Sequence, residues 1–325
     1  MDVCLGIEST AHTFSVGVIK GKKVLANVKD VFTTEKGGMI PIDVAKHHER
    51  VYQNVINSAL ERAGMKLGDV SLVSYSRGPG LGPCLHVGLD VAKGIAKKND
   101  VPIVGVNHCV SHLSIGNLTT NAKDPVLLYV SGANTQVIAY EGKKYRVFGE
   151  TLDQGVGNFL DSFARYIGLG FPGGPKIYEL SIKSKNLVEL PYSVKGMDVS
   201  VSGLLTNLKQ KYDSKNFKVE DLAYSAQETV FAMLLEVSER AMAHCKKKEL
   251  LLGGGVACNK RLQEMAKIMC KERGGKCFIP PNEFLVDQGA MIAWQGILEK
   301  KNAVKPDKAE IRPYERTDDI VVNWL

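Results

Sequence analysis

The sequence predicts an α/β protein in which a βββαβαβα unit occurs twice, with a ligand-binding cleft between the two copies. Short apolar runs bounded by turn residues alternate with longer segments whose apolar residues recur at helical spacing. The order of these segments restarts near residue 126. Turn chemistry repeats as well, because aligning Ser9 with Ser131 also aligns Thr13 with Thr135. A repeat this long, with matching turn chemistry, indicates a duplicated domain rather than a solenoid.

In the first unit, a meander of three strands precedes a helix and two strand–helix pairs. An apolar stripe that begins near Asp43 stops at Gly64, and glycine commonly ends a helix. A loop rich in glycine and proline at residues 78–83 separates the fourth strand from the next helix. The predicted strands are 3–9, 13–19, 23–31, 71–76 and 103–106, and the predicted helices are 43–63, 85–98 and one that starts at His108.

The second unit repeats this order but contains a loop-rich insertion at about 168–218. We therefore expect a first domain at residues 1–123 and a second at 124–325, with the last helix packing back on the first domain. The tail after Lys301 is polar and carries no predicted element. The predicted strands are 126–130, 135–140, 144–149, 249–252 and 277–280, and the predicted helices are 159–167, 221–245, 259–270 and 288–300.

Such a duplication describes the actin-like ATPase architecture (ASKHA, RNase H-like) that sugar kinases and heat-shock chaperones share. Nucleotide is then expected between the copies. The two hairpin turns, Glu8–Thr13 and Ser131–Thr135, are rich in small and hydroxylic residues. Their backbone N–H groups and hydroxyls could hold a phosphate chain from both sides. The alternative is that both are ordinary hairpins, for which this composition is also suitable.

Composition sets limits on location and partners. The chain has 325 residues, 44% of them apolar, which suffices for two cores. No apolar window reaches the roughly 18–20 residues that a membrane span needs, and the N-terminal residues lack the pattern of a signal peptide, so we expect a cytoplasmic protein.

Seven irregularly spaced cysteines without a Cys-x-x-Cys pair argue against a disulfide framework or a cysteine zinc site. The formal charge of +7 is compatible with a nucleic-acid partner but does not require one.

Two histidines one helical turn apart are the strongest candidate metal ligands. His108 and His112 follow the strand at 103–106, so an i, i+4 spacing places both on one helical face. Asp287, before the last apolar helix, is the best candidate for a third ligand. The alternatives are a capping and a core histidine, and an aspartate that caps its helix. The other histidines are expected to be structural or surface residues, namely His12, His47, His48, His86 and His244.

Three further segments suggest a nucleotide pocket, each with a structural alternative. The triple glycine at 253–255 lies between a strand and a helix, where adenine or ribose could bind, or where close packing alone needs glycine. Asp161 could reach a ribose hydroxyl, or could interact with a helix dipole. Residues 171–175, Phe-Pro-Gly-Gly-Pro, could form one edge of a pocket or close a loop.

Eight motifs occur in order over nearly the whole chain: Gly6–Thr13, Val106–His112, Tyr129–Val137, Gly149–Asp153, Phe171–Lys176, Ser202–Thr206, Gly253–Ala257 and Asp287–Met291. In these motifs the sequence resembles the TsaD family of tRNA threonylcarbamoyladenosine synthesis proteins, once called O-sialoglycoprotein endopeptidases. It is most similar to the archaeal and eukaryotic branch that serves the KEOPS complex.

The resemblance implies transfer of the threonylcarbamoyl group from threonylcarbamoyl-AMP to N6 of adenosine in tRNAs that read codons beginning with adenine. It implies tRNA, a small atypical kinase and small accessory subunits as partners, and no membrane. It also implies one divalent metal, iron(II) in preference to zinc, and an adenine nucleotide (threonylcarbamoyl-AMP, ATP or AMP) as ligand. The implied metal and catalytic residues are His108, His112 and Asp287, with Tyr129 near the metal. The implied pocket is Tyr129, Val130, Ser131, Gly132, Ala133, Asp161, Gly174, Tyr178 and Asn259.

The sequence departs from the family pattern at four positions. Ala133 replaces a common glycine, Cys258 a common alanine, and Gln288 the asparagine that usually follows the metal-binding aspartate. Tyr178 stands where relatives carry an acid, and a phenol can donate a hydrogen bond but carries no charge at neutral pH.

Three other functions compete with this interpretation. A small-molecule kinase of the same fold would use ATP, Mg²⁺ and a catalytic aspartate, and would not need the histidines. A metallopeptidase would be expected to carry a glutamate between its histidines, and the segment from His108 to His112 has none. A nucleotide-gated scaffold would bind partners without turnover.

Overall fold

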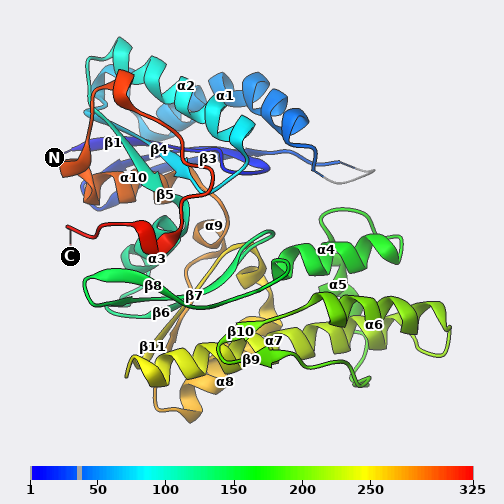
Figure 1. The fold of residues 1–325 in the computed structure, drawn as a ribbon. Coiled ribbons are helices and arrows are strands. Elements are labelled where there is room, and N and C mark those ends of the chain that lie inside the picture. Colours follow the sequence, from blue (N-terminus) through cyan, green and yellow to red (C-terminus); the bar gives the residue numbers. More distant parts are fainter. Residues whose placement is uncertain (1, 35–38, 325) are drawn as a thin grey trace.

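The computed structural model describes residues 2–34 and 39–324 and contains two five-stranded sheets, one above the other in Figure 1. In the upper sheet the strand order is β3-β2-β1-β4-β5, with β1, β2 and β3 antiparallel and β4 and β5 parallel to β1. The elements of this half are β1 Val3–Glu8, β2 Thr13–Lys20, β3 Lys23–Val31, α1 Pro41–Ala63, η1 Leu67–Asp69, β4 Leu72–Gly78, α2 Gly82–Lys98, β5 Ile103–Asn107 and α3 His108–Thr119.

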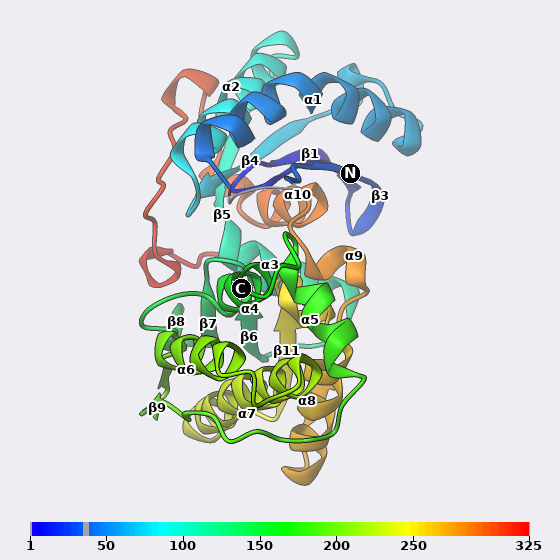
Figure 2. The same cartoon turned by 90° about the vertical axis from the view of Figure 1, so that its right-hand side faces the viewer.

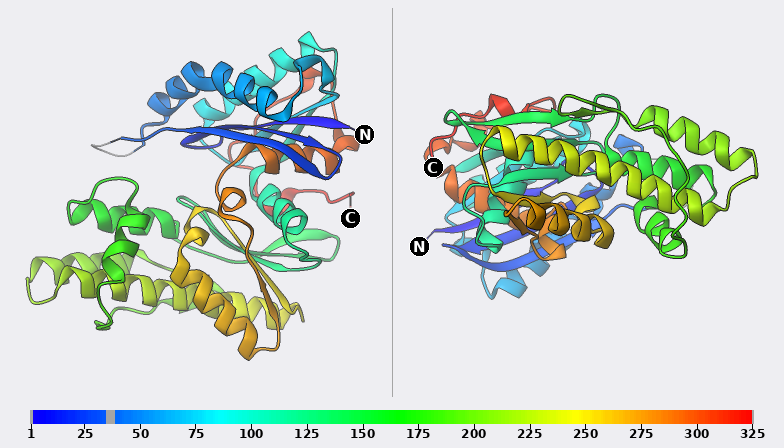
Figure 3. Two further views of the ribbon diagram at one scale, coloured as in Figure 1. Left: turned by 180° about the vertical axis from the view of Figure 1, so that it is seen from behind. Right: turned by 90° about the horizontal axis from the view of Figure 1, so that it is seen from below.

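The lower sheet has the equivalent order β12-β11-β6-β7-β8, so the predicted duplicated α/β fold is confirmed. Its strands and helices are β6 Val126–Val130, β7 Thr135–Glu141, β8 Lys144–Glu150, α4 Val156–Tyr166, α7 Val219–His244, β11 Glu249–Gly253, η2 Gly255–Cys258, α8 Lys260–Glu272, β12 Lys276–Phe278, α9 Asn282–Leu285 and α10 Gly289–Leu298. Figure 3 shows α7 and α8 covering the underside of this sheet.

The expected insertion is more structured than its composition suggests. It contains α5 Gly173–Ser181, the short hairpin β9 Val194–Lys195 with β10 Asp198–Val199, and α6 Ser202–Asp213. Apolar residues of α6, such as Leu204 and Leu208, are buried in the same core as α7. These helices were missed because their few apolar residues do not form a long periodic stripe.

Helix α10 packs on the upper sheet, although it follows the last strand of the lower one (Figures 1 and 2). A Cβ on Gly6 would lie 2.2 Å from the backbone nitrogen of Ala293, and a Cβ on Gly17 would lie 2.1 Å from that of Ala290. Only glycine permits such close approach of helix and sheet backbones. The Ser15 hydroxyl also accepts a hydrogen bond from Gly289 N at 2.8 Å. The position of the residues just before α10 is therefore set by the upper sheet.

The polar tail is an ordered strap that spans both sheets (Figure 2). We call residues 309–324 the C-terminal strap; it includes η5 Thr317–Asp319 and follows η3 Lys300–Asn302 and η4 Pro306–Lys308. At its start, Ala309 packs in the core of the upper sheet. Near its end, Ile320 is buried in a cluster with Tyr129 and Leu127 of the lower sheet. Within the described residues, no helix is long and apolar enough to cross a bilayer.

The expectation that His47 and His48 are surface residues is wrong. Both are buried on the inner side of α1. His47 Nε2 lies 2.8 Å from the Asp30 carboxylate, and His48 Nε2 donates to the carbonyl of Ala11 at 2.9 Å. Burial lowers the pKa of His48 to about 4, so the ring is neutral in the folded protein. The polar neighbouring residues therefore gave no sign that both side chains are buried, His48 against the first hairpin turn and His47 against β3.

Candidate metal and nucleotide site

Helix α3 places two imidazoles on one face at the end of strand β5. Asn107 ends the strand and caps the helix, because its side chain accepts a hydrogen bond from Val110 N at 3.1 Å. His108 and His112 are then the first and fifth residues of the helix, and both are buried. The predicted spacing is therefore realised with a cap that fixes where the helix begins.

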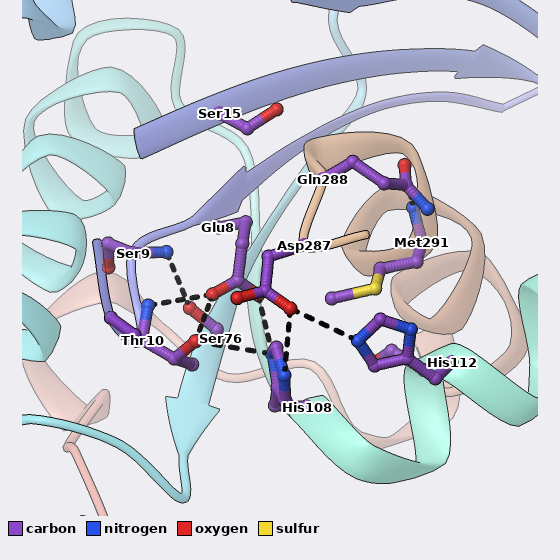
Figure 4. A network of polar contacts seen from close by, with 12 residues as sticks. Glu8, Ser9, Thr10, Ser15, Ser76, His108, His112, Asp287, Gln288 and Met291 are labelled. Carbon is purple, nitrogen blue, oxygen red and sulfur yellow. Dashed lines mark hydrogen bonds and ion pairs between the residues drawn. The ribbon is translucent and has the colours of Figure 1, made fainter. Parts of the chain in front are cut away.

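Asp287 meets both histidines at the upper sheet (Figure 4). Its Oδ1 lies 3.3 Å from His112 Nε2 and 3.5 Å from His108 Nε2. One potential ligand atom from each of the three residues lies within 4.8 Å of the others. Bonds of about 2.1 Å to a tetrahedral ion would separate ligand atoms by about 3.4 Å. Both the spacing and the donor types thus fit a divalent ion bound by two imidazoles and one carboxylate.

Glu8 is a candidate functional residue that the sequence interpretation did not single out. Its side chain is fully buried at the end of β1, and Oε2 accepts a hydrogen bond from His108 Nδ1 at 2.9 Å. Its Oε1 accepts from Thr10 N at 2.7 Å. A proton held on Nδ1 leaves Nε2 of His108 free to act as a ligand. The available signal was an acid at the end of the first apolar strand, at the start of the predicted hairpin turn Glu8–Thr13.

Tyr129 brings the lower sheet to the same point. It is the last residue but one of β6, and its hydroxyl lies 3.0 Å from His108 Nε2. Its ring centroid is 4.8 Å from that of His112. Burial raises the pKa of Tyr129 well above its ordinary value, so the phenol stays protonated near neutral pH.

Opposing effects set the charges in this cluster. Burial disfavours an imidazolium at His108, but the carboxylates of Glu8 and Asp287 outweigh it and raise the pKa of His108 to about 9. Burial lowers the pKa of His112. Burial opposes ionisation of Asp287, but the two histidines hold its pKa below the ordinary value. The cluster therefore keeps a permanent carboxylate beside two imidazoles, and a bound cation would replace the proton on His108.

A cavity of about 570 Å³ opens beside these residues and is bordered by both halves of the chain. Four backbone N–H groups on its lining, from Ala11, His12, Gly132 and Ala133, donate no hydrogen bond within the described parts of the chain. Two belong to each predicted hairpin turn. Free N–H groups on residues that line a cavity can provide a site for an anion such as phosphate.

The remaining predicted pocket residues lie at different distances from this cavity. Asp161 lines it, and its Oδ1 also accepts hydrogen bonds from Gly173 N at 2.7 Å and Gly174 N at 3.3 Å. Val130, Gly174, Tyr178 and Asn259 are not among the lining residues. Asn259 caps α8 and donates to Gln227 Oε1 at 2.6 Å. Phe171, from the predicted rigid turn, does line the cavity.

The triple glycine supports the lower sheet rather than opening α8 directly. Gly254 has φ +88, and a Cβ there would lie 2.3 Å from the carbonyl oxygen of Val130. The 3-10 helix η2 separates it from the start of α8 at Lys260. Glycine is therefore required for backbone contact with β6, the strand that carries Tyr129.

Comparison with known proteins gives a consistent family. The family model TsaD, tRNA N6-adenosine threonylcarbamoyltransferase, matches residues 23–294. A tRNA N6-adenosine threonylcarbamoyltransferase from Thermococcus kodakarensis is 52% identical over 324 residues, which is 99% of each chain. A protein from Methanocaldococcus jannaschii described as a probable bifunctional tRNA threonylcarbamoyladenosine biosynthesis protein is 49% identical over 99% of this chain and 60% of its own length.

Solved structures support the fold. HypF from T. kodakarensis has a TM-score of 0.67 at 16% identity, over 93% of this chain and 48% of that one. The activator of 2-hydroxyisocaproyl-CoA dehydratase from Clostridium difficile, solved with bound ADPNP, has a TM-score of 0.55 at 13% identity, over 92% and 96% of the two chains. Both similarities concern the duplicated ATPase-like fold.

Proposed function

This chain belongs to the TsaD family of tRNA N6-adenosine threonylcarbamoyltransferases, and from that premise we propose its substrates and the roles of its residues. It moves the threonylcarbamoyl group of threonylcarbamoyl-AMP onto N6 of the adenosine just 3′ of the anticodon, in tRNAs that read codons beginning with adenine. The observation that carries this proposal is the contact between a His-His-Asp cluster and a cavity with free N–H groups from both hairpin turns.

The two hairpin turns hold the phosphate of the adenylate. The N–H groups of Ala11 and His12 would donate to it from the first turn, and those of Gly132 and Ala133 from the second; all four residues line the cavity. Small residues at these positions allow the backbone to approach the anion closely. Asp161 and Phe171 then lie at the ribose and adenine end of the cavity. The ligand extends from there toward Gly174, Tyr178 and Asn259. Val130, the last residue of β6, lies beneath the ligand.

The metal cluster lies at the reacting end of the ligand. His108, His112 and Asp287 hold one divalent ion, for which iron(II) and zinc both suit the donor set, and Tyr129 lies beside it. When bound, the ion supplies Lewis-acid polarisation of the threonylcarbamoyl carbonyl. Glu8 keeps His108 in the tautomer that directs Nε2 toward Asp287.

The transfer step exchanges one bond for another. The N6 amine of adenosine attacks the carbonyl carbon, the bond from that carbon to the phosphate oxygen breaks, and AMP leaves with the electron pair. One N6 proton is released to solvent. The free N–H groups of Gly132 and Ala133 stabilise negative charge that grows on the leaving phosphate, because donors already in place need no reorganisation in the transition state.

We propose that the chain works in a KEOPS-type assembly with a small atypical kinase and small accessory subunits. The M. jannaschii relative supports a linked partner, because this chain covers only 60% of a protein whose description says bifunctional. Cytoplasmic location fits a tRNA substrate.

Mass spectrometry of tRNA nucleosides tests the proposal. The chain is incubated with threonylcarbamoyl-AMP, tRNA and the partner subunits, and the modified nucleoside is quantified. The double variant His108→Ala plus His112→Ala should abolish the product, whereas Glu239→Gln, which changes an acid paired with Arg273 and not on the cavity lining, should not. Full product from the double variant would refute the role of the cluster. ATP turnover with a small substrate but no tRNA product would favour a kinase of the same fold.

A further inference from the structure

The turn of the C-terminal strap at residues 312–315 is fixed beside the cavity by backbone hydrogen bonds. Arg312 N donates to the carbonyl of Arg77 at 2.7 Å, and Gly80 N donates to the carbonyl of Pro313 at 3.1 Å. A Cβ on Gly78 would lie 1.9 Å from the carbonyl oxygen of Arg312. Glycine at this position is therefore what lets the strap lie against the end of β4.

The same turn is tied to the helix that carries the metal ligands. Glu315 is buried, and its carboxylate lies 2.8 Å from Arg77 Nη2. Asn107 Nδ2 donates to Glu315 Oε2 at 3.3 Å. Asn107 is also the residue whose side chain caps α3. One side chain thus links the turn to the start of the helix that begins with His108.

This rigid turn presents one aromatic side chain to solvent at the edge of the cavity. Tyr314 borders the cavity and is 94% exposed. Its hydroxyl has no hydrogen-bond partner within the described ranges. Other exposed tyrosines differ, because the hydroxyl of Tyr192 is bonded to Glu236 and that of Tyr166 to Asp213. Backbone hydrogen bonds fix the position of the turn, and the ring is almost fully exposed, so Tyr314 offers an open aromatic face at the edge of the cavity.

The charges around Tyr314 indicate which part of a nucleic acid would meet it. Two cations of the strap flank Tyr314, and both are paired with acids. Arg312 lies 2.7 Å from Glu310, and Arg316 lies 3.1 Å from Asp318 and 3.5 Å from Glu150. The strap also contains Asp319. Carboxylates disfavour phosphate at this edge, whereas a base can stack on an aromatic ring without any cation. Bases of single-stranded RNA loops are commonly recognised in this way.

We propose that Tyr314 stacks on a base of the tRNA anticodon loop that neighbours the modified adenosine. The inference rests on the proposed function and adds a residue that positions the acceptor. With the neighbouring base held at the cavity edge, the target adenosine can enter toward the metal cluster. Tyr314 touches tRNA and not the reacting atoms, so it acts on acceptor binding.

Steady-state transfer kinetics with the full chain and its partner subunits test this role. Tyr314→Ala should raise the KM for tRNA about tenfold, within the range expected for stacking on one base, and leave kcat at saturating tRNA unchanged. Tyr314→Phe should resemble the parent chain, because stacking needs the ring and not the hydroxyl. Tyr192→Ala, which removes an exposed tyrosine of the insertion, serves as the matched control and should leave the KM for tRNA unchanged.

A fluorescence measurement provides a second readout. In Tyr314→Trp, the new indole should be quenched when an anticodon stem-loop RNA binds, and the parent chain with its two native tryptophans should not show that change. An unchanged KM for tRNA in Tyr314→Ala, with the parent chain active, would overturn the stacking role alone. The stacking role would also be overturned if Tyr314→Ala weakened binding of a partner subunit while the KM for tRNA stayed unchanged. Absence of transfer by the parent chain would overturn both this role and the proposed function.

Discussion

The substitution Glu8→Gln tests how the buried carboxylate controls the metal ligand. In the structure, Glu8 Oε2 accepts a hydrogen bond from His108 Nδ1, and Oε1 accepts from Thr10 N. Glutamine has the same shape but only one acceptor oxygen. If that oxygen stays on Thr10, the amide nitrogen faces Nδ1 and two donors oppose each other. His108 can relieve this contact by moving its proton to Nε2, but that nitrogen then no longer binds a metal.

The expected effect of Glu8→Gln is a weaker metal site in a folded protein. Loss of such a hydrogen-bonded partner to a histidine ligand typically lowers metal affinity by about 10–100-fold, or roughly 1.4–2.7 kcal/mol. Calorimetric titration of the metal-free chain with zinc or with iron(II) under anaerobic conditions measures this change. Glu150→Gln, which alters another carboxylate on the cavity lining, should keep the parent affinity. Parent-like metal affinity in Glu8→Gln would refute the tautomer argument.

Three further predictions concern the metal, the pH and the strap. Asp287→Asn should lower the transfer rate at least about 100-fold and weaken metal binding in the same titration, since the only carboxylate facing both Nε2 atoms among the described residues is lost. The folded pKa of His48 lies near 4, below the ordinary value of about 6.5, so its neutral form favours folding above pH 6.5 and that stability is lost as the pH falls toward 4, by roughly 3 kcal/mol at most. Denaturant titrations across this window should therefore show a smaller pH dependence in His48→Gln, whose amide can still donate to Ala11; an unchanged dependence would contradict this assignment. Gly78→Ala should lower the free energy of unfolding by about 1–3 kcal/mol or more, because its Cβ would overlap the Arg312 carbonyl; parent-like stability would contradict the packing of the strap.

Local patterns in the sequence were enough to predict the repeated fold and to select the three residues that the structure brings together as a candidate metal cluster. Alternation and helical spacing depend on neighbouring residues, so the order of elements up to α3 could be deduced before any contact was known. The placement of His108 and His112 on one face follows from their spacing of one helical turn. Asp287 could be named as a candidate third ligand from its place before the last apolar helix, but its approach to the histidines depends on the packing of α10 against the upper sheet, which no local pattern predicts.

Contacts between distant residues account for what the sequence interpretation missed. Glu8 gains its role from His108, 100 residues away, and such a contact leaves no periodic signal. The sequence of the strap is polar, so no element was predicted there. In the structure its charged residues form ion pairs with Arg77 and Glu150, and a few apolar residues such as Ile320 pack in the core. The expectation that His47 and His48 lie on the surface was wrong because it relied on the polarity of adjacent residues, whereas their burial depends on contacts with Asp30 and Ala11.

The central claim is that one ion, bound by His108, His112 and Asp287, lies at the reacting end of an adenylate held by both hairpin turns. A crystal structure of the metal-loaded chain with a non-hydrolysable threonylcarbamoyl-AMP analogue, with anomalous scattering measured at the metal edge, tests it directly. The account predicts an anomalous peak about 2.1 Å from the Nε2 atoms of both histidines and from an Asp287 carboxylate oxygen, with the phosphate at Ala11 and Gly132. A peak elsewhere, or a phosphate that avoids the hairpin turns, would contradict it.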